Sequence, residues 1–540
     1  YVPVRYETNG GTVNFTGSQM LFSDATLIGN AGGASAVGGT VNVTSGRYIQ
    51  PGTAFTSADA NLVVVQDGRV LPVGGLTRGV GLPVRDSGGT SVAAIGNFAV
   101  DRFHAGGFAS LALNGNVRFA ESVSIQADAS LRVANGGAIY SNDAVNLKAN
   151  YVSLGQAFRA PALATDQIVL FTQTDIASIT TPYSFAPTGG TGSLTVRAET
   201  IDVGTLSLQG FRSASLNAAK GDIRGNGTLQ MVGDLSLQAG QIYPTTLRSF
   251  DVFVYDPVGG SGSVTISGGA ARSLPLSAGG QLGIYASEIR QDGTLRAPIG
   301  TIELGWDGTG TAPVNEIAGT TATTPTTDLL TLGSHSVTSV SGNDPITGRN
   351  VLIPFGISFD GNSWIDPAGN DITAGGVPGK QVNLAGGTVV SEPGSVIDIR
   401  GGGDLYAYRW VSGNGGTRDL LASTSVYAVI PGYDFDYAPY APFNTTGGGT
   451  NLQGEPGYVN GTLRPGDRIT LGASENLPGG TYTLLPARYA LLPGAVLVTP
   501  LSGAPVGSRN QDDGSSVVSG YRSSDLDPGR VGRTTMQRFE

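Results

Sequence analysis

The chain has 540 residues, of which 84 are glycine and 13% are charged. A charged fraction about half the ordinary ~25% excludes a polyelectrolyte-like disordered chain, and the glycines lack the collagen period. The formal net charge is −10 and no basic run is present, which excludes the basic patch of nucleic-acid-binding proteins. The absence of cysteine excludes a disulfide framework and thiol chemistry, and it is compatible with export.

Pairs of apolar residues separated by one residue recur along most of the chain. This spacing has the period of two that a β-strand with one buried face requires. Residues 1–100 hold such pairs at wide intervals, and we expect a β-helical shaft with longer loops there. Residues 101–305 hold them closely, and we expect a regular shaft; the clearest pairs are Val117/Phe119, Val123/Ile125, Leu131/Val133, Val145/Leu147 and Val152/Leu154.

The short interval between these pairs favours one class of all-β fold over the antiparallel sandwich. Within residues 117–154 most pairs start 6 to 8 residues apart, whereas antiparallel sandwiches space their strands at about 8–12 residues. Three such strands make a coil of roughly 20 residues, which is the repeating unit of a parallel β-helix. The sequence therefore predicts an all-β solenoid, a parallel β-helix with loop excursions.

Proline marks a change of organisation near residue 240, because seven prolines precede this point and 22 follow it. Proline cannot donate to a sheet ladder, so central strands avoid it. We expect a loop-rich excursion and return to the shaft at 306–380 and a short piece of shaft at 381–400. An aromatic-rich excursion is expected at 401–460, and a continuing, truncated β-rich shaft at 461–540.

Several long motifs resemble one family of proteins. They include QAGQIYPTT at 238–246, VNLAGGTVVSEPGSVIDIRGGGDLYAYRW at 382–410, AVIPGYDFDYAPYAPFN at 428–444 and LPGGTYTLLPARYALLPGAVLV at 477–498. These stretches resemble the large filamentous-haemagglutinin-like exoproteins and adhesins of Gram-negative bacteria. The resemblance is close over about 238–522 and extends to 1–237 only in general pattern.

This resemblance implies a right-handed parallel β-helix within a larger protein of the cell surface. It implies two-partner (type Vb) secretion, with a dedicated outer-membrane pore as the partner. Such a chain would be secreted and extracellular, and its open ends suggest head-to-tail self-association into filaments.

Catalytic and metal-binding patterns are weak in this sequence. His104 and His335 lie far apart and neither has a second metal ligand at a suitable spacing. A polysaccharide-degrading β-helix enzyme would need clustered carboxylates, for which Asp512–Asp513 and the pair Asp434 and Asp436 are the candidates. We expect ordinary loop acids, no enzyme, no metal and no cofactor.

An aromatic cluster within 401–460 is the main candidate binding feature. Aromatic faces with nearby polar groups can stack on sugars or bury a protein partner. The structural alternative is that these rings pack the excursion against the shaft. The candidate ligand-binding residues are Tyr406, Tyr408, Trp410, Tyr433, Phe435, Tyr437 and Tyr440.

Four functions remain open from the sequence. The first is the structural shaft of a secreted adhesin or extracellular filament that mediates adhesion or biofilm-matrix contacts. The others are a module binding a glycan or a host-surface receptor through 401–460, the stalk of a contact-dependent inhibition toxin, and a polysaccharide-degrading enzyme.

Overall fold

Alternating apolar residues form short strands throughout the computed structural model. The structure describes residues 7–17, 20–45, 60–72, 95–156, 185–317, 322–348, 350–358, 360–413, 416–423, 425–433, 463–464, 466–503, 507–528 and 537–540. These residues form an all-β protein with one short α-helix, α1 (Asp101–Ala105). None of the helices in these ranges is long and apolar enough to cross a membrane.

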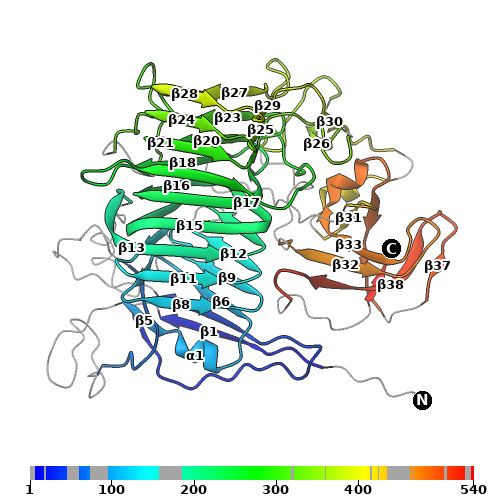
Figure 1. The fold of residues 1–540 in the computed structure, drawn as a ribbon. Helices are drawn as coiled ribbons and strands as arrows, with labels where there is room; N and C mark the ends of the chain where they lie inside the picture. Colours follow the sequence, from blue (N-terminus) through cyan, green and yellow to red (C-terminus); the bar gives the residue numbers. More distant parts are fainter. Residues whose placement is uncertain are drawn as a thin grey trace, which may run out of the picture.

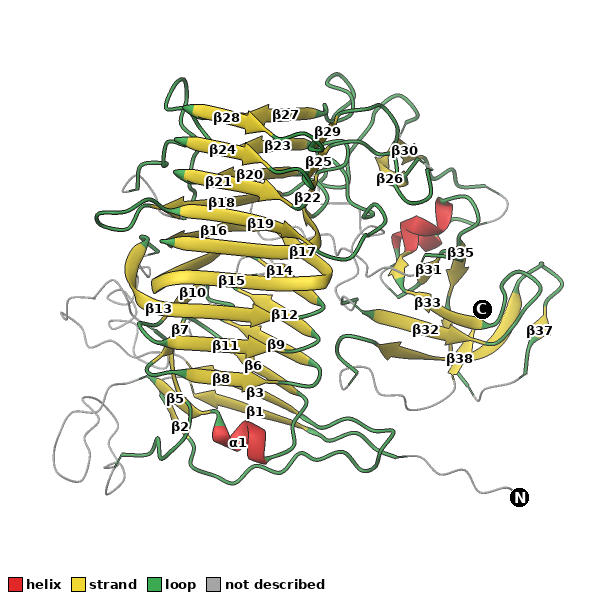
Figure 2. Ribbon diagram, viewed as in Figure 1, coloured by secondary structure: helices red, strands yellow, loops and turns green. Residues whose placement is uncertain are grey.

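The dominant element is a 28-stranded sheet in which every pairing is parallel (Figures 1 and 2). Its strands stack in three rows. The first row contains β1 (Thr12–Gly17), β3 (Thr40–Ser45), β6 (Ser110–Leu113), β9 (Ser130–Val133), β12 (Tyr151–Leu154), β14 (Thr200–Val203), the end of β15 (Leu206–Gly225), the end of β17 (Asp234–Pro244), β22 (Thr294–Arg296), β25 (Val337–Ser339) and β29 (Val396–Asp398).

The other two rows complete the large sheet. The second row contains β2 (Leu21–Phe22), β5 (Gly96–Ala99), β4 (Leu62–Val65), β7 (Val117–Phe119), β10 (Ala138–Tyr140), the start of β15, β16 (Gly227–Val232), β18 (Ser249–Tyr255), β20 (Gln281–Tyr285), β23 (Thr301–Leu304) and β27 (Gln381–Leu384). The third row contains β8 (Val123–Gln126), β11 (Ala144–Lys148), β13 (Thr188–Arg197), the middle of β15, the start of β17, β19 (Ser263–Gly268), β21 (Glu288–Asp292), β24 (Leu329–Leu332) and β28 (Thr388–Ser391).

Register neighbours in the regular part of the sheet lie at a nearly constant sequence interval. Ser110 and Ser130 are 20 residues apart, and Asp202 and Arg224 are 22 apart. The interval agrees with the expected repeat of roughly 20 residues. Each strand therefore places the same kind of residue over its neighbour.

The core follows directly from this register. In the first row one buried apolar column runs through successive strands, and the second and third rows contribute similar columns to the same core cluster. The members of the first column are Val41, Leu111, Leu131, Val152, Ile201, Ile223, Ile242 and Leu295.

Helix α1 lies beside β8, the first strand of the third row (Figure 2). The Phe103 ring is fully buried in the core and stacks on Phe108, with 6.3 Å between the ring centroids. His104 Nε2 accepts a hydrogen bond from the backbone N–H of Gln126 in β8, at 3.3 Å. The helix thus supplies a partner to the edge of β8, where the unpaired ladder would otherwise face solvent.

Residues 306–380 combine loops with two strands of the large sheet. Strands β24 and β25 lie inside this segment and pair with β21 and β22. Leu330 and Leu332 alternate with polar residues and are fully buried. This alternation places Leu329–Leu332 in the sheet, although the surrounding composition is typical of a loop.

The expectation of a continuing shaft over 461–540 is wrong for the described part of that segment. Its strands pair antiparallel, and none of them joins the large parallel sheet. A six-stranded set contains β32 (Asp467–Leu471), β33 (Gly480–Thr483), β36 (Pro500–Leu501), β37 (Arg509–Asn510), β38 (Ser516–Ser524) and β39 (Gln537–Phe539). A three-stranded set contains β31 (Tyr427–Val429), β34 (Leu485–Pro486) and β35 (Val496–Val498).

A tight turn explains one of these antiparallel pairings. Between β37 and β38 the chain reverses at Gly514, which has a left-handed φ of 84°. The preceding Asp513 carboxylate accepts hydrogen bonds from the backbone N–H and the hydroxyl of Ser515. A reversal of this kind brings consecutive strands together as a hairpin, whereas parallel strands need a longer connection.

This antiparallel unit lies along one side of the large sheet (Figure 1). The buried Asp527 carboxylate links the two parts, because it accepts a hydrogen bond from Ser110 Oγ and pairs with Arg132 at 2.9 Å. Apolar contact adds to this link, since Leu276 packs in one cluster with Leu485 and Tyr489. The outward side of the first row is consequently buried along part of its length.

An ion pair between the neighbouring strands β14 and β15 is buried on that side. Arg224 binds Asp202 through two bonds, Nε–Oδ1 at 2.7 Å and Nη2–Oδ2 at 2.8 Å, and both side chains are fully buried. The Tyr151 hydroxyl donates to Asp202 Oδ2 at 2.7 Å. Bidentate geometry with a further donor is what a buried carboxylate requires.

We predict that Arg224→Met lowers the free energy of unfolding by about 3–5 kcal/mol, because it leaves the Asp202 charge buried without its ionic partner. Chemical denaturation measures this loss. Arg400→Met is the matched control, since Arg400 pairs with Asp398 at 2.9 Å while its side chain is 68% exposed. The control should lose about 1 kcal/mol or less; equal losses in the two variants would contradict the prediction.

Candidate binding cleft at the end of the parallel sheet

A cleft of about 480 Å³ lies where the large sheet ends. One wall is the segment that leads into β27, and the other is the start of β30 (Asp404–Tyr408). Strand β30 pairs in parallel with β26 (Leu352–Ile357), outside the large sheet. The lining residues are Ile299, Val377, Pro378, Lys380, Gly403, Asp404, Leu405 and Tyr406.

Lys380 joins the two walls of the cleft. Its ammonium donates to the carbonyl oxygen of Gly402 at 2.6 Å and to that of Arg400 at 3.3 Å. Partial burial lowers the pKa of Lys380, and the nearby Asp398 and Asp404 carboxylates oppose this shift. An ammonium has three donors, so one remains for a ligand beyond these two bonds.

Two adjacent glycines allow the chain to turn into β30. Gly402 and Gly403 have φ values of 102° and 81°, a region that residues with a side chain rarely adopt. A Cβ atom on Gly403 would also lie 2.9 Å from Ile299 Cδ1. The turn therefore requires glycine for its backbone conformation and for the close approach to the sheet.

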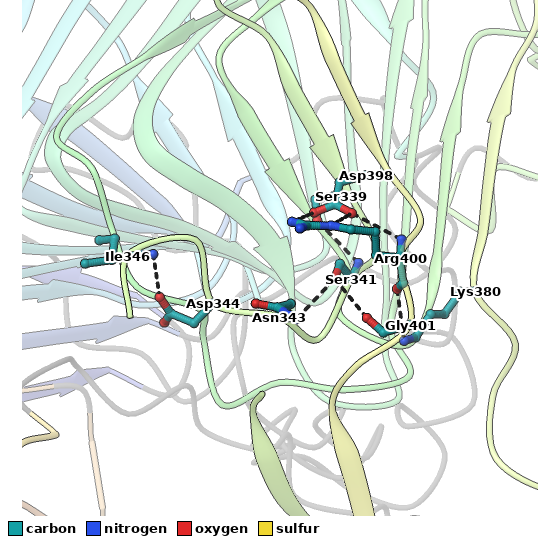
Figure 3. A network of polar contacts seen from close by, with 9 residues as sticks. All are labelled: Ser339, Ser341, Asn343, Asp344, Ile346, Lys380, Asp398, Arg400 and Gly401. Atoms are coloured by element: carbon teal, nitrogen blue, oxygen red, sulfur yellow. Dashed lines mark hydrogen bonds and ion pairs between the residues drawn. The ribbon is translucent and has the colours of Figure 1, made fainter. Parts of the chain in front are cut away.

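A polar network supports the cleft from the loops that follow β25 and β29 (Figure 3). Asp398 binds Arg400 through Nε and Nη2, both at 2.9 Å, and these bonds together lower the pKa of Asp398. Ser341 Oγ donates to the carbonyl of Gly401 at 3.4 Å and accepts from the backbone N–H of Asn343 at 3.1 Å. The network fixes residues 400–402, and the carbonyls of Arg400 and Gly402 hold Lys380.

The predicted aromatic residues separate into different surroundings. Tyr406 lines the cleft with 43% of its surface exposed, and its ring lies 6.4 Å from that of Tyr408. Burial raises the pKa of Tyr408, and Tyr406 contributes to the same shift. Trp410 is 47% exposed just beyond β30.

Among the remaining candidates only Tyr433 lies in the described part of the chain, and it is not one of the residues that line the cleft. Tyr433 packs against the apolar cluster formed by Leu276, Ala428 and neighbouring residues of the antiparallel unit. Its surroundings therefore match the structural alternative, a ring that packs the excursion. Phe435, Tyr437 and Tyr440 lie outside the described residues.

Sequence reasoning missed Lys380 and Asp404, which bring charge to the cleft. The chain contains only three lysines, but rarity alone does not indicate a site. Their proximity depends on the stacking of β27 beside β23 and on the turn into β30. Together with Tyr406 they offer a cationic donor, an exposed carboxylate and an aromatic face to a polar ligand.

Across the described ranges, no group of three or more His, Asp or Glu residues is placed to hold a metal ion. Asp513 is engaged in its turn, and Asp434 and Asp436 lie outside those ranges. His335 is exposed beside Asp292, 3.6 Å away.

The second row carries one pair of interacting carboxylates. Asp251 and Glu303 lie two strands apart over Gly283, and Tyr285 donates its hydroxyl to Glu303 at 2.7 Å. Burial raises the pKa of Asp251 to about 7, and the Glu303 and Glu316 carboxylates add to the shift. A Cβ on Gly283 would lie 2.3 Å from Asp251 Oδ1, so the carboxylate occupies the space that glycine leaves.

We predict that Asp251 makes folding less favourable as pH rises from about 4 to about 7. Its folded pKa exceeds the unfolded value, so its contribution to stability is complete below pH 4 and is lost as pH rises through 7. Asp251→Asn should flatten this dependence and raise the free energy of unfolding at pH 8, on the order of 3 kcal/mol. Urea denaturation at several pH values measures the change, with Asp234→Asn on the exposed end of β17 as control; identical slopes would contradict the assignment.

No family model, curated protein or solved structure matches this chain.

Proposed function

We propose that the chain forms the stiff shaft of a secreted cell-surface adhesin or extracellular filament, built as a right-handed parallel β-helix. The observation that carries this proposal is the arrangement of parallel strands in three rows over a continuous apolar core. A strand that returns to the same row after about 20 residues has coiled once around that core. Right-handed crossovers between parallel strands are by far the more common, which supports the handedness.

The mechanical properties of such a shaft follow from its hydrogen bonds. The ladder bonds run along the rod axis, and each coil adds about 4.8 Å to the length. Bending the rod would break ladder bonds and open the core. A rod of this kind suits a protein that must hold a contact surface away from a cell.

Secretion and partners belong to the same proposal. The resemblance of residues 238–522 to filamentous-haemagglutinin-like exoproteins supports export through an outer-membrane two-partner pore. Adhesive contacts, with a host receptor or with the biofilm matrix, are assigned to the loops and units beside the rod. We propose no catalytic step.

Electron cryo-microscopy of the purified chain, together with immunogold labelling of intact cells that express the gene, tests this function. We expect rods with an axial spacing of about 4.8 Å and gold particles on unpermeabilised cells. Globular particles without that spacing would contradict the shaft. Labelling that requires permeabilised cells would contradict the surface location.

The end of the sheet at β27, β28 and β29 supports head-to-tail self-association. Val389 and Ile397 continue the inward columns of the core, yet they are 43% and 44% exposed because no described strand follows them. At the opposite end of the sheet, β1 and β2 are the first strands of two rows and leave the ends of these rows open. Helix α1 covers the end of the third row. A second copy could therefore continue two of the three rows.

We predict that Val389→Lys prevents this association, because a charge on an open sheet edge opposes strand pairing. Sedimentation velocity over a range of concentrations should show filaments for the original chain and monomers for the variant. Thr331→Lys, which lies one strand inside on the outward face, is the control and should still associate. A monomeric original chain at all concentrations would contradict self-association.

A further inference from the structure

Strand β30 has one edge that no described strand occupies. On its paired edge, the backbone N–H of Asp404 donates to Val351 at 2.9 Å, and Tyr408 accepts from Ser358 at 2.7 Å. In a parallel pair, every second residue directs both backbone groups to the same neighbour. Leu405 and Ala407 therefore direct their N–H and C=O groups to the other edge.

The cleft follows the start of this free edge, as far as Tyr406. Four consecutive residues, Gly403 to Tyr406, contribute to its lining. Side chains alternate between the two faces of a strand, so a pocket on one face would be lined by every second residue. A groove that runs along the backbone edge, in contrast, is lined by consecutive residues.

The opposite wall complements an extended chain. Val377 and Pro378 present apolar surface, and Val377 is 44% exposed. Lys380 keeps one ammonium donor beyond its bonds to the carbonyls of Arg400 and Gly402, and this donor can bind a peptide carbonyl or carboxylate. Tyr406 supplies a half-exposed ring on the facing strand.

We propose that the β30 edge binds an extended peptide segment of a partner protein, which adds as a third strand beside β26 and β30. The partner's backbone would pair with the outward groups of Leu405 and Ala407, and a carbonyl or carboxylate of the peptide would meet Lys380. Strand addition of this kind obtains affinity from main-chain bonds and selectivity from alternate side chains. The inference deepens the proposed adhesive function and rests on it.

A peptide fits these observations better than a saccharide does. Sugar sites depend on aromatic faces and on side-chain hydrogen bonds, which Tyr406, Asp404 and Lys380 could supply. The outward-facing N–H and C=O groups of Leu405 and Ala407 would contribute nothing to a saccharide site. An additional β-strand, however, needs these backbone groups as hydrogen-bond partners.

The test uses the whole chain and a displayed library of linear heptapeptides. Enriched peptides are resynthesised with a fluorophore, and their affinities are measured by fluorescence anisotropy. Ala407→Pro removes one outward N–H, which an edge strand tolerates because that group makes no bond to β26. Ala407→Ser keeps the N–H and is the matched control.

We expect Ala407→Pro to weaken binding about tenfold, as loss of one main-chain bond at a partly buried edge predicts, and Ala407→Ser to bind as the original chain does. Binding should slow amide exchange at Leu405 and Ala407. As a test independent of folding, peptides N-methylated at alternate residues should bind the original chain in one methylation pattern and fail in the other.

Three results would overturn the inference. They are no enrichment by the original chain, equal affinity of both methylation patterns, and glycan-array binding that Tyr406→Ala abolishes but Ala407→Pro leaves intact. The last result would assign the cleft to a saccharide. Rods seen by electron microscopy with no peptide binding would refute this inference while leaving the proposed shaft in place.

Discussion

The fold depends on the hydrogen-bonded ladder between parallel strands that share one register. Side chains alternate across a strand, so a slip of one residue would turn every apolar column outward. Each strand in a row is therefore constrained by the strands on both sides of it. Burial of the Val, Leu and Ile columns supplies the energy that keeps this register, and no single strand could bury its apolar residues alone.

This constraint acts on the strands and leaves the connections free. Strands β11 and β13 remain in register although a long stretch of chain separates them, and so do β24 and β28. The entropic cost of closing a loop grows slowly with its length. Long excursions can consequently leave one strand of a row and return at the next without disturbing the core.

Covering one side of the sheet changes the chemistry of its outward residues. Asp202 and Arg224 occupy outward positions, where an exposed pair would contribute little. Here they are fully buried and bound to each other, and Asp527 of the antiparallel unit meets Ser110 and Arg132 a few strands away. The docked unit and the sheet are therefore coupled by the Asp527–Arg132 ion pair, to which each part contributes one charge.

The sequence by itself determined the all-β class, the strand positions at 117–154 and the repeat of about 20 residues, because these depend on local alternation and on spacing. It also indicated Tyr406 and Tyr408 as members of an aromatic excursion. The antiparallel pairing within 466–540 escaped prediction, since apolar alternation is the same in parallel and antiparallel strands. Only the tertiary structure brought Lys380 to Asp404 and Tyr406, because Lys380 lies in a different segment of the chain and meets β30 through the stacking of β27 and the turn into β30. Contacts of this kind depend on how the excursions fold back, and no local pattern encodes that.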